Sequence, residues 1–325
     1  MSGVQHHRRA LMGCVAAMAA GLGGCQADPM APLRLGAHAW PGYELLFLAR
    51  TLGALRAEVV HLAEMPSASA SLRGLATGSL DAAGLTLDEV LTGLSRGIEL
   101  VVVGVLDVSL GADVVLARPG LASVSDLRGR RIGVESSATG AVMLDAMLSR
   151  HGLQLSDVRV VPVAFDEHEG RWLAGQVDAL VTFEPISSRL QAAGARVLFS
   201  SAEVPGRIVD VLAVRRDALA AQAVAIRHAL AGHFAGLEVL RAQPADSLAR
   251  LAPRLGQPVT EVARAYSALQ LPGLADNRGW LRAGGRLKDT AARLRTVMLA
   301  GGLLARAVDL DALASEAYLP AGAAA

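Results

Sequence analysis

The chain has 325 residues, of which 52% are hydrophobic, so it can bury one or two sizeable cores and is not a disordered chain. Its formal net charge is +1 and no basic block follows the N-terminal residues, which excludes the electrostatic footprint of a nucleic-acid-binding protein. Lys288 is the only lysine and lies in a polar segment, so Schiff-base chemistry has little support.

The N-terminus predicts an export signal over residues 1–24. Two arginines precede an apolar run of about a dozen residues, which is too short to span a bilayer. The run ends in "LGGC", which resembles a lipobox, so we expect Cys25 to carry a lipid and residues 25–32 to form a tether. An ordinary secretory signal is the alternative. Cys14 leaves with the signal, so the mature chain retains one cysteine and no disulfide is expected.

From residue 33 onward, short apolar runs alternate with amphipathic stretches, which predicts an α/β fold with mostly parallel sheets. The expected strands are 33–40, 57–65, 80–86, 99–107, 130–136, 158–164, 177–184, 195–201 and 208–216. The expected helices are 42–53, 67–78, 87–97, 137–152 and 167–176, followed by a helical tail from residue 217. Thr86 with Glu89 predicts a capping box at the start of the third helix.

Five segments in this order resemble the periplasmic substrate-binding proteins of ABC importers, in the branch that binds nitrate, taurine, sulfonates and pyrimidine precursors. The segments are "WPGYELLFLARTLG", "SASASLRGLATGSLDAAGLTLDE", "DLRGRRIGVESSATG", "LAGQVDALVTFEP" and "VDLDALAS". The resemblance covers residues 33 to 320. It implies a two-lobed periplasmic-binding-protein-like (type II) fold with a helical C-terminal tail and a ligand cleft between lobes that close by a hinge. By this likeness, residues 33–107 and 208–325 form lobe I and residues 108–207 form lobe II.

Ligands of open parallel sheets bind beyond the carboxyl ends of the strands, where loops and helix N-termini converge. Applied to the expected strands, this rule selects a set of candidate ligand-binding residues, to which we add an aspartate inside the apolar run 207–214. The candidates are Trp40, Tyr43, Leu85, Thr86, Asp107, Ser136, Ser137, Thr139, Gly140, Glu184 and Asp210.

Most of these candidates also have a purely structural interpretation. Trp40 and Tyr43 offer flat faces with polar tips for a planar or cationic ligand, or they pack as a hydrophobic staple. The hydroxyls and N–H groups of "ESSATG" suit an anionic oxygen, or simply cap a helix, as Thr86 does. Glu184 contacts the ligand or pairs with Arg189, while the two aspartates contact the ligand or support the hinge.

Three candidate carboxylates without an arginine at a strand end favour a neutral or cationic solute, such as a pyrimidine or an amine, over nitrate or sulfonate. A projection of Arg73, Arg118 or Arg207 into the cleft would reverse this inference. His168 lies among acidic residues, and we expect a solvated first helical turn there rather than a metal site.

The resemblance implies an extracytoplasmic solute receptor of an ABC importer, whose partners are a permease, its ATPase subunit and, through the lipid, a membrane. Its expected location is the periplasm or the cell surface. No Walker motif occurs in the chain, so the motor would be a separate protein, and no cofactor is expected. One alternative is a pyrimidine-synthase-like enzyme of the same fold, although its lysine, histidine and cysteine-rich motif are not found at matching places. The other is an extracytoplasmic sensor that does not transport its ligand.

Overall fold

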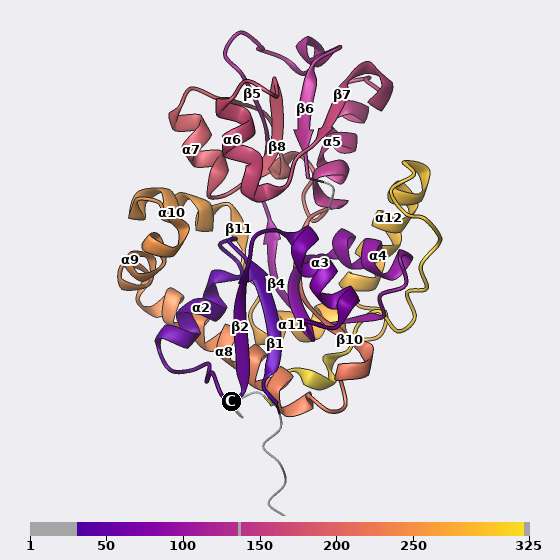
Figure 1. Ribbon diagram of the computed structural model, residues 1–325. Helices are drawn as coiled ribbons and strands as arrows, with labels where there is room; N and C mark the ends of the chain where they lie inside the picture. The colour runs from indigo at the N-terminus through magenta and orange to yellow at the C-terminus, as the bar shows by residue number, and fades with distance from the viewer. Residues whose placement is uncertain (1–30, 136–137, 322–325) are drawn as a thin grey trace, which may run out of the picture. The chain divides into compact units, whose positions relative to one another are not determined.

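The computed structural model describes residues 31–135 and 138–321 (Figure 1). The fold below is that of the compact unit Pro32–Ala325. The predicted signal peptide and lipid-bearing Cys25 lie outside the described residues, as do Ser136 and Ser137. None of the helices in the described ranges combines the length and apolar character that a membrane crossing requires.

Two mixed β-sheets, each flanked by helices, organise the unit Pro32–Ala325 (Figure 1). The strands of the six-stranded sheet, in spatial order, are β11 (Leu269–Gln270), β4 (Leu100–Ser109), β10 (Val209–Arg215), β3 (Ala82–Thr86), β1 (Leu33–His38) and β2 (Val60–Met65). Those of the five-stranded sheet are β7 (Arg159–Pro162), β6 (Arg131–Val134), β8 (Ala179–Phe183), β5 (Asp113–Ala117) and β9 (Arg196–Ser200). We call the part built on the first sheet lobe I and the part built on the second lobe II.

The helices follow the predicted order along the chain. Those before β10 are α2 (Glu44–Thr51), α3 (Ala68–Thr77), α4 (Leu87–Ser95), α5 (Ala138–Arg150), α6 (His168–Leu173) and α7 (Ile186–Ala192). The C-terminal tail contains α8 (Ala223–Ala242), α9 (Pro244–Leu255), α10 (Val259–Ser267), α11 (Leu274–Leu281) and α12 (Arg286–Ala300). The predicted capping box of α4 is confirmed, because Thr86 accepts from the Glu89 N–H and donates its own N–H to the Glu89 carboxylate.

The expectation of mostly parallel sheets is wrong. β1 pairs in parallel with β2 and β3, and β6 pairs in parallel with β7 and β8. However, β10 runs antiparallel to both β3 and β4, and β5 runs antiparallel to both β8 and β9. The chain reaches β5 directly from lobe I and β10 directly from lobe II. Each of these strands therefore runs opposite to its neighbours in the sheet that it joins. An apolar run has the same sequence pattern in either direction, so periodicity alone could not reveal this.

The helical tail is joined to lobe I by an ion pair between a partly exposed arginine and a buried glutamate. Arg254 on α9 donates from Nε to Glu44 Oε2 at 2.6 Å and from Nη2 to Glu44 Oε1 at 3.2 Å. Its guanidinium also lies 3.7 Å from the centre of the Phe47 ring. Gly236 on α8 permits close contact with α2, since a Cβ there would lie 2.5 Å from the Leu45 carbonyl oxygen. These contacts fix α2 next to the loop that carries Trp40.

Candidate ligand-binding site

A small cavity lies between the two lobes, at the ends of several strands. Its volume is about 20 Å³. The lobe I side chains that line it are His38, Trp40, Thr86, Glu89 and Asp210, and those of lobe II are Asp113, Thr139 and Phe183. Since small-molecule sites usually measure about 300–1,000 Å³, the lobes are closed here and a solute can enter only when they separate.

Aromatic rings from both lobes meet at this cavity. The ring of Phe183, at the end of β8, lies 5.4 Å from Trp40 in an edge-to-face arrangement. It also stacks on Phe165 with ring centres 4.2 Å apart. The imidazole of His38, at the end of β1, lies 5.2 Å from the ring of Tyr43. Such rings provide an apolar enclosure with π faces that can stack on a planar solute or cover a cation.

Three buried aspartates converge beneath the rings. Asp107 and Asp210 are directly paired across the antiparallel strands β4 and β10, so their side chains share one face of the sheet. The indole N–H of Trp40 donates to Asp107 Oδ2 at 2.9 Å, and the Tyr43 hydroxyl donates to Asp210 Oδ1. Asp113 comes from lobe II. Within the described residues, one oxygen of each carboxyl group is buried with no N–H or hydroxyl donor, and Asp107 and Asp210 hydrogen-bond each other.

Burial makes these carboxyl groups hold their protons near neutral pH. Desolvation raises the pKa of Asp107 to about 7, although the Trp40 hydrogen bond opposes this shift. Desolvation likewise raises the pKa of Asp113 to about 7, opposed by a hydrogen bond from Ser109. For Asp210, desolvation and then the charge of Asp107 raise the pKa well above its usual value. Burial lowers the pKa of His38 to about 4, so this imidazole is neutral.

Two glycines make the arrangement of side chains possible. A Cβ at Gly42 would lie 1.7 Å from Asp107 Oδ2, so only glycine allows the carboxylate to reach the Trp40 indole. A Cβ at Gly84 would lie 3.0 Å from the Tyr43 ring, which packs flat against the β3 backbone. At Gly42 the backbone therefore approaches the carboxylate more closely than any other residue type would allow, and at Gly84 it leaves little room for a Cβ beside the ring.

Hydrogen bonds between the lobes hold the closed arrangement. The hydroxyls of Thr86 and Thr139 lie 2.7 Å apart across the cavity. The Ser69 hydroxyl, at the start of α3, donates to Glu135 Oε1 at 3.1 Å after β6. The Gln257 amide, between α9 and α10, donates to the Pro185 carbonyl at 3.0 Å. Each bond joins groups of the two lobes that must separate when the cleft opens.

Comparison with known proteins assigns the family. Residues 49–247 match the family model described as NMT1/THI5 like, which is more than half of the chain. The chain belongs to the NMT1/THI5-like family. The structure of the alkanesulfonate-binding protein of Xanthomonas axonopodis pv. citri, bound to MOPS, is similar with a TM-score of 0.76 and 22% identity, over 89% of this chain and 99% of that one. This likeness confirms the predicted periplasmic-binding-protein fold.

Two curated proteins illustrate the sequence relatives of this NMT1/THI5-like chain. A binding protein of Brucella abortus is 31% identical over 75 residues, or 23% of this chain and 24% of that protein. The chain thus matches about a quarter of that relative's length. An aliphatic sulfonates-binding protein of Escherichia coli K12 is 26% identical over 203 residues, or 62% of this chain and 63% of that protein.

The predicted site residues of this NMT1/THI5-like chain occupy different places. Trp40, Thr86, Thr139 and Asp210 line the cavity. Tyr43 and Asp107 do not line the cavity but are hydrogen-bonded to residues that do. The Tyr43 hydroxyl donates to Asp210, and Asp107 accepts from the Trp40 indole.

The remaining described candidates lie outside the cavity lining. Leu85 is fully buried in the hydrophobic core of lobe I. Gly140 packs against Val134, because a Cβ there would lie 2.7 Å from that side chain. Glu184 accepts hydrogen bonds from Ser188 and Gln257. Its alternative pairing with Arg189 does not form, since that arginine pairs with Glu169.

The arginines that could have reversed the charge inference do not line this cavity. Arg73 is exposed on α3. Arg118 donates to the backbone carbonyls of Val177 and Trp172. Arg207 lines a different pocket. The described part of the cavity lining therefore contains no cation.

The expectation for His168 is wrong. This histidine is buried rather than solvated, and its Nδ1 lies 3.1 Å from the Thr182 hydroxyl. His168 lies inside lobe II and packs edge-on against Phe165, while its neighbours Asp166 and Glu167 are exposed. Within residues 31–135 and 138–321, no group of three histidine, cysteine or acidic side chains could hold a metal ion.

Sequence reasoning missed four cavity residues. His38 and Phe183 end β1 and β8, so the strand-end rule could have found them. Glu89 was assigned only to the capping box. Asp113 begins β5, a strand that the sequence did not predict, so nothing in the pattern pointed to it.

Loss of the inter-lobe hydroxyl contact should favour opening. Thr139→Val keeps the side-chain shape but removes the partner of Thr86, so the unfolding free energy should fall by about 1 kcal/mol. The radius of gyration from small-angle X-ray scattering should increase. Thr296→Val, on an exposed face of α12, should change neither quantity. An unchanged radius of gyration and stability for Thr139→Val would show that this contact does not hold the lobes.

Proposed function

We propose that this chain is an extracytoplasmic solute-binding receptor of an ABC importer, selective for a small cationic or N–H-donating solute. The observation that carries this proposal is the set of carboxyl oxygens on Asp107, Asp113 and Asp210 that no N–H or hydroxyl group of the described residues reaches, buried beneath aromatic rings. Lobe closure around the solute would create the surface that a permease and its ATPase subunit respond to.

The chemistry of the cavity favours a donor as its ligand. A buried acceptor without a partner costs about 1–3 kcal/mol, and an amine or the amidine edge of an aminopyrimidine supplies N–H groups to several acceptors at once. Trp40 and Phe183 supply faces for a flat ring or a cation. A sulfonate, the ligand class of the E. coli and Xanthomonas relatives, would instead place its acceptor oxygens against the acceptor oxygens of Asp113 and Asp210.

The proposal includes the location and organisation predicted from the sequence. Residues 1–24 act as a signal peptide, and Cys25 carries the lipid that tethers the receptor to a membrane at the periplasm or cell surface. Residues 33–107 and 208–325 form lobe I, and residues 108–207 form lobe II. The receptor role is preferred to catalysis because Lys288, the only lysine, pairs at 2.7 Å with Asp311 on the surface.

A thermal-shift screen of the protein without residues 1–24 tests the function. Protonated amines and aminopyrimidines should raise the midpoint, whereas alkanesulfonates and nitrate should not. A ligand present at 100 times its Kd stabilises the fold by about 2.7 kcal/mol, which is readily measured. A shift produced by alkanesulfonates and not by amines would overturn the proposed selectivity.

Two aspartate variants locate the binding site. Asp210→Asn keeps an oxygen that can accept from Tyr43 but replaces the other carboxyl oxygen with an NH2 donor, so it should abolish the ligand-induced shift. Asp246→Asn removes only an exposed carboxylate from α9 and should leave the shift intact. A full shift in Asp210→Asn would place the ligand elsewhere.

A further inference from the structure

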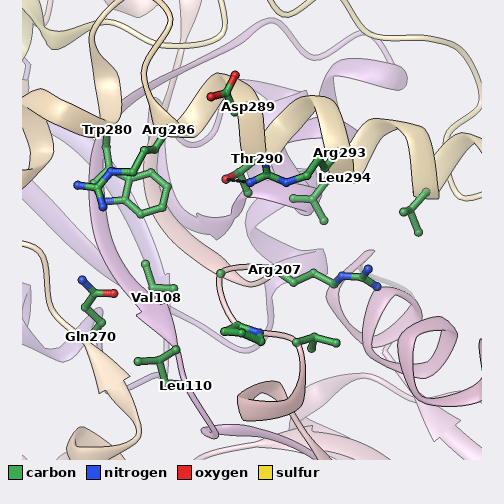
Figure 2. A pocket seen from close by; sticks show the side chains of 14 residues that line it. Val108, Leu110, Arg207, Gln270, Trp280, Arg286, Asp289, Thr290, Arg293 and Leu294 are labelled. Carbon is green, nitrogen blue, oxygen red and sulfur yellow. Dashed lines mark hydrogen bonds between the residues drawn. The ribbon is translucent and has the colours of Figure 1, made fainter. Parts of the chain in front are cut away.

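A second and much larger hollow lies beside the two segments that connect the lobes (Figure 2). Its volume is about 640 Å³, within the usual range of about 300–1,000 Å³ for small-molecule sites. One wall contains Val108 and Leu110 at the end of β4 together with residues 204–207, which precede β10. The facing wall is α12. We call this hollow the hinge pocket.

Positive charge dominates the hinge pocket. Arg207, Arg286 and Arg293 line it, against a single carboxylate from Asp289. Ion pairs within the described residues use none of these three arginines. Their planar guanidinium groups present paired N–H donors, which match the oxygens of carboxylates, sulfonates and phosphates.

Trp280 adds a buried donor at the wall of the hinge pocket. Its side chain lines the pocket and is only 6% exposed, yet its indole N–H has no hydrogen-bond partner among the described residues. The Arg286 guanidinium lies 4.9 Å from the centre of the Trp280 ring, so the indole also positions a cation. A buried donor without an acceptor carries a free-energy cost, which a ligand oxygen that reaches the N–H would remove.

Apolar side chains complete the lining. The apolar residues that line the pocket include Val108, Leu110, Val204, Leu294 and Val297. A simple inorganic ion would leave these surfaces in contact with water, whereas a ligand with a short hydrocarbon part would cover them. The lining thus combines several donors with an apolar surface.

We propose that the hinge pocket binds a small amphipathic organic anion, a carboxylate, sulfonate or phosphate ester that carries a short apolar chain. This site shares no lining residue with the cavity between Trp40 and Asp113, and arginines line it instead of carboxyl groups. It is therefore an addition to the proposed receptor function and does not depend on it. Because Leu110 and Val204 belong to the two segments that connect the lobes, the anion contacts both connections.

Isothermal titration calorimetry with hexane-1-sulfonate tests the proposal, using the protein without residues 1–24. Hexylamine and hexan-1-ol, which have the same chain but no negative charge, should bind the hinge pocket far more weakly. The double variant Arg207→Gln/Arg286→Gln should weaken hexane-1-sulfonate binding at least about tenfold, because two charge-assisted contacts are lost. Arg278→Gln changes the charge of α11 outside the pocket and should leave the affinity unchanged.

The results of this experiment separate a failure of the hinge-pocket proposal from a failure of the proposed receptor function. Absence of hexane-1-sulfonate binding, or equal binding by the double variant, would overturn the hinge-pocket proposal. A loss of binding in Asp210→Asn rather than in the double variant would place the sulfonate in the central cavity, which also contradicts the proposed selectivity for cations. Binding of amines that requires Asp210 would support the receptor function whatever the hinge pocket does. Thermal midpoints of all variants check that they are folded.

Discussion

At pH 8, Asp113→Asn is expected to be more stable than the unchanged protein and to lose its response to ligand. Burial raises the pKa of Asp113 to about 7, whereas an unfolded aspartate titrates near 3.9. The folded state thus retains a proton that the unfolded state has released, so Asp113 costs stability as the pH rises from about 4 through 7. Asparagine has no such cost.

The advantage of Asp113→Asn should grow by about 2–3 kcal/mol between pH 5 and pH 8, as one pH unit corresponds to about 1.4 kcal/mol for one proton. Urea unfolding at the two pH values measures this change. Asp178→Asn is the matched control. The Arg131 hydrogen bond holds the pKa of Asp178 below its usual value, so that side chain is ionised throughout and its variant should lose the same stability at both pH values.

Equal effects of Asp113→Asn at pH 5 and pH 8 would show that the carboxyl group does not titrate near neutrality in the fold. If the variant is more stable but still responds to amines, Asp113 is not part of the ligand site. A stabilised variant without a ligand response is the signature of a residue retained for binding at the expense of stability.

Element order could be predicted from the sequence because apolar runs and amphipathic stretches have different periods. β1, β2 and α3 match their expected ranges to within a few residues. The prediction failed where pairing partners are distant along the chain. β10 inserts between β3 and β4, and no local pattern records which strand a buried run will pair with or in which direction.

The rule that ligands bind at the carboxyl ends of strands selected residues from distant segments that do meet in the structure. Trp40 and Thr86 both line the cavity. The rule had no access to Asp113, which lies at the first residue of its strand instead of the last. Nor could it anticipate that β4 and β10 would place two aspartates face to face. Such a juxtaposition depends on tertiary pairing, which a local pattern does not encode.

Gly42→Ala is expected to destabilise the protein and to disrupt the site. The new methyl group would lie 1.7 Å from Asp107 Oδ2 and 3.0 Å from the Trp40 indole nitrogen, so the carboxylate and indole must both move. Overpacking of this kind costs about 1–3 kcal/mol, and displacement of Asp107 from its 2.9 Å hydrogen bond removes an interaction as well. Thermal unfolding measures the loss, and ligand titration should show weaker binding.

Gly170→Ala is the matched control for Gly42→Ala. Gly170 lies on α6, where an added Cβ would meet nothing within 4 Å, so alanine there should leave stability unchanged or raise it by up to about 1 kcal/mol. Ligand binding should be unaffected by that change. If Gly42→Ala is as stable as Gly170→Ala and binds ligand normally, the close approach of Asp107 to the Gly42 backbone does not position the site. A selective loss in Gly42→Ala would instead show that the backbone of this turn determines where the carboxylate and the indole meet.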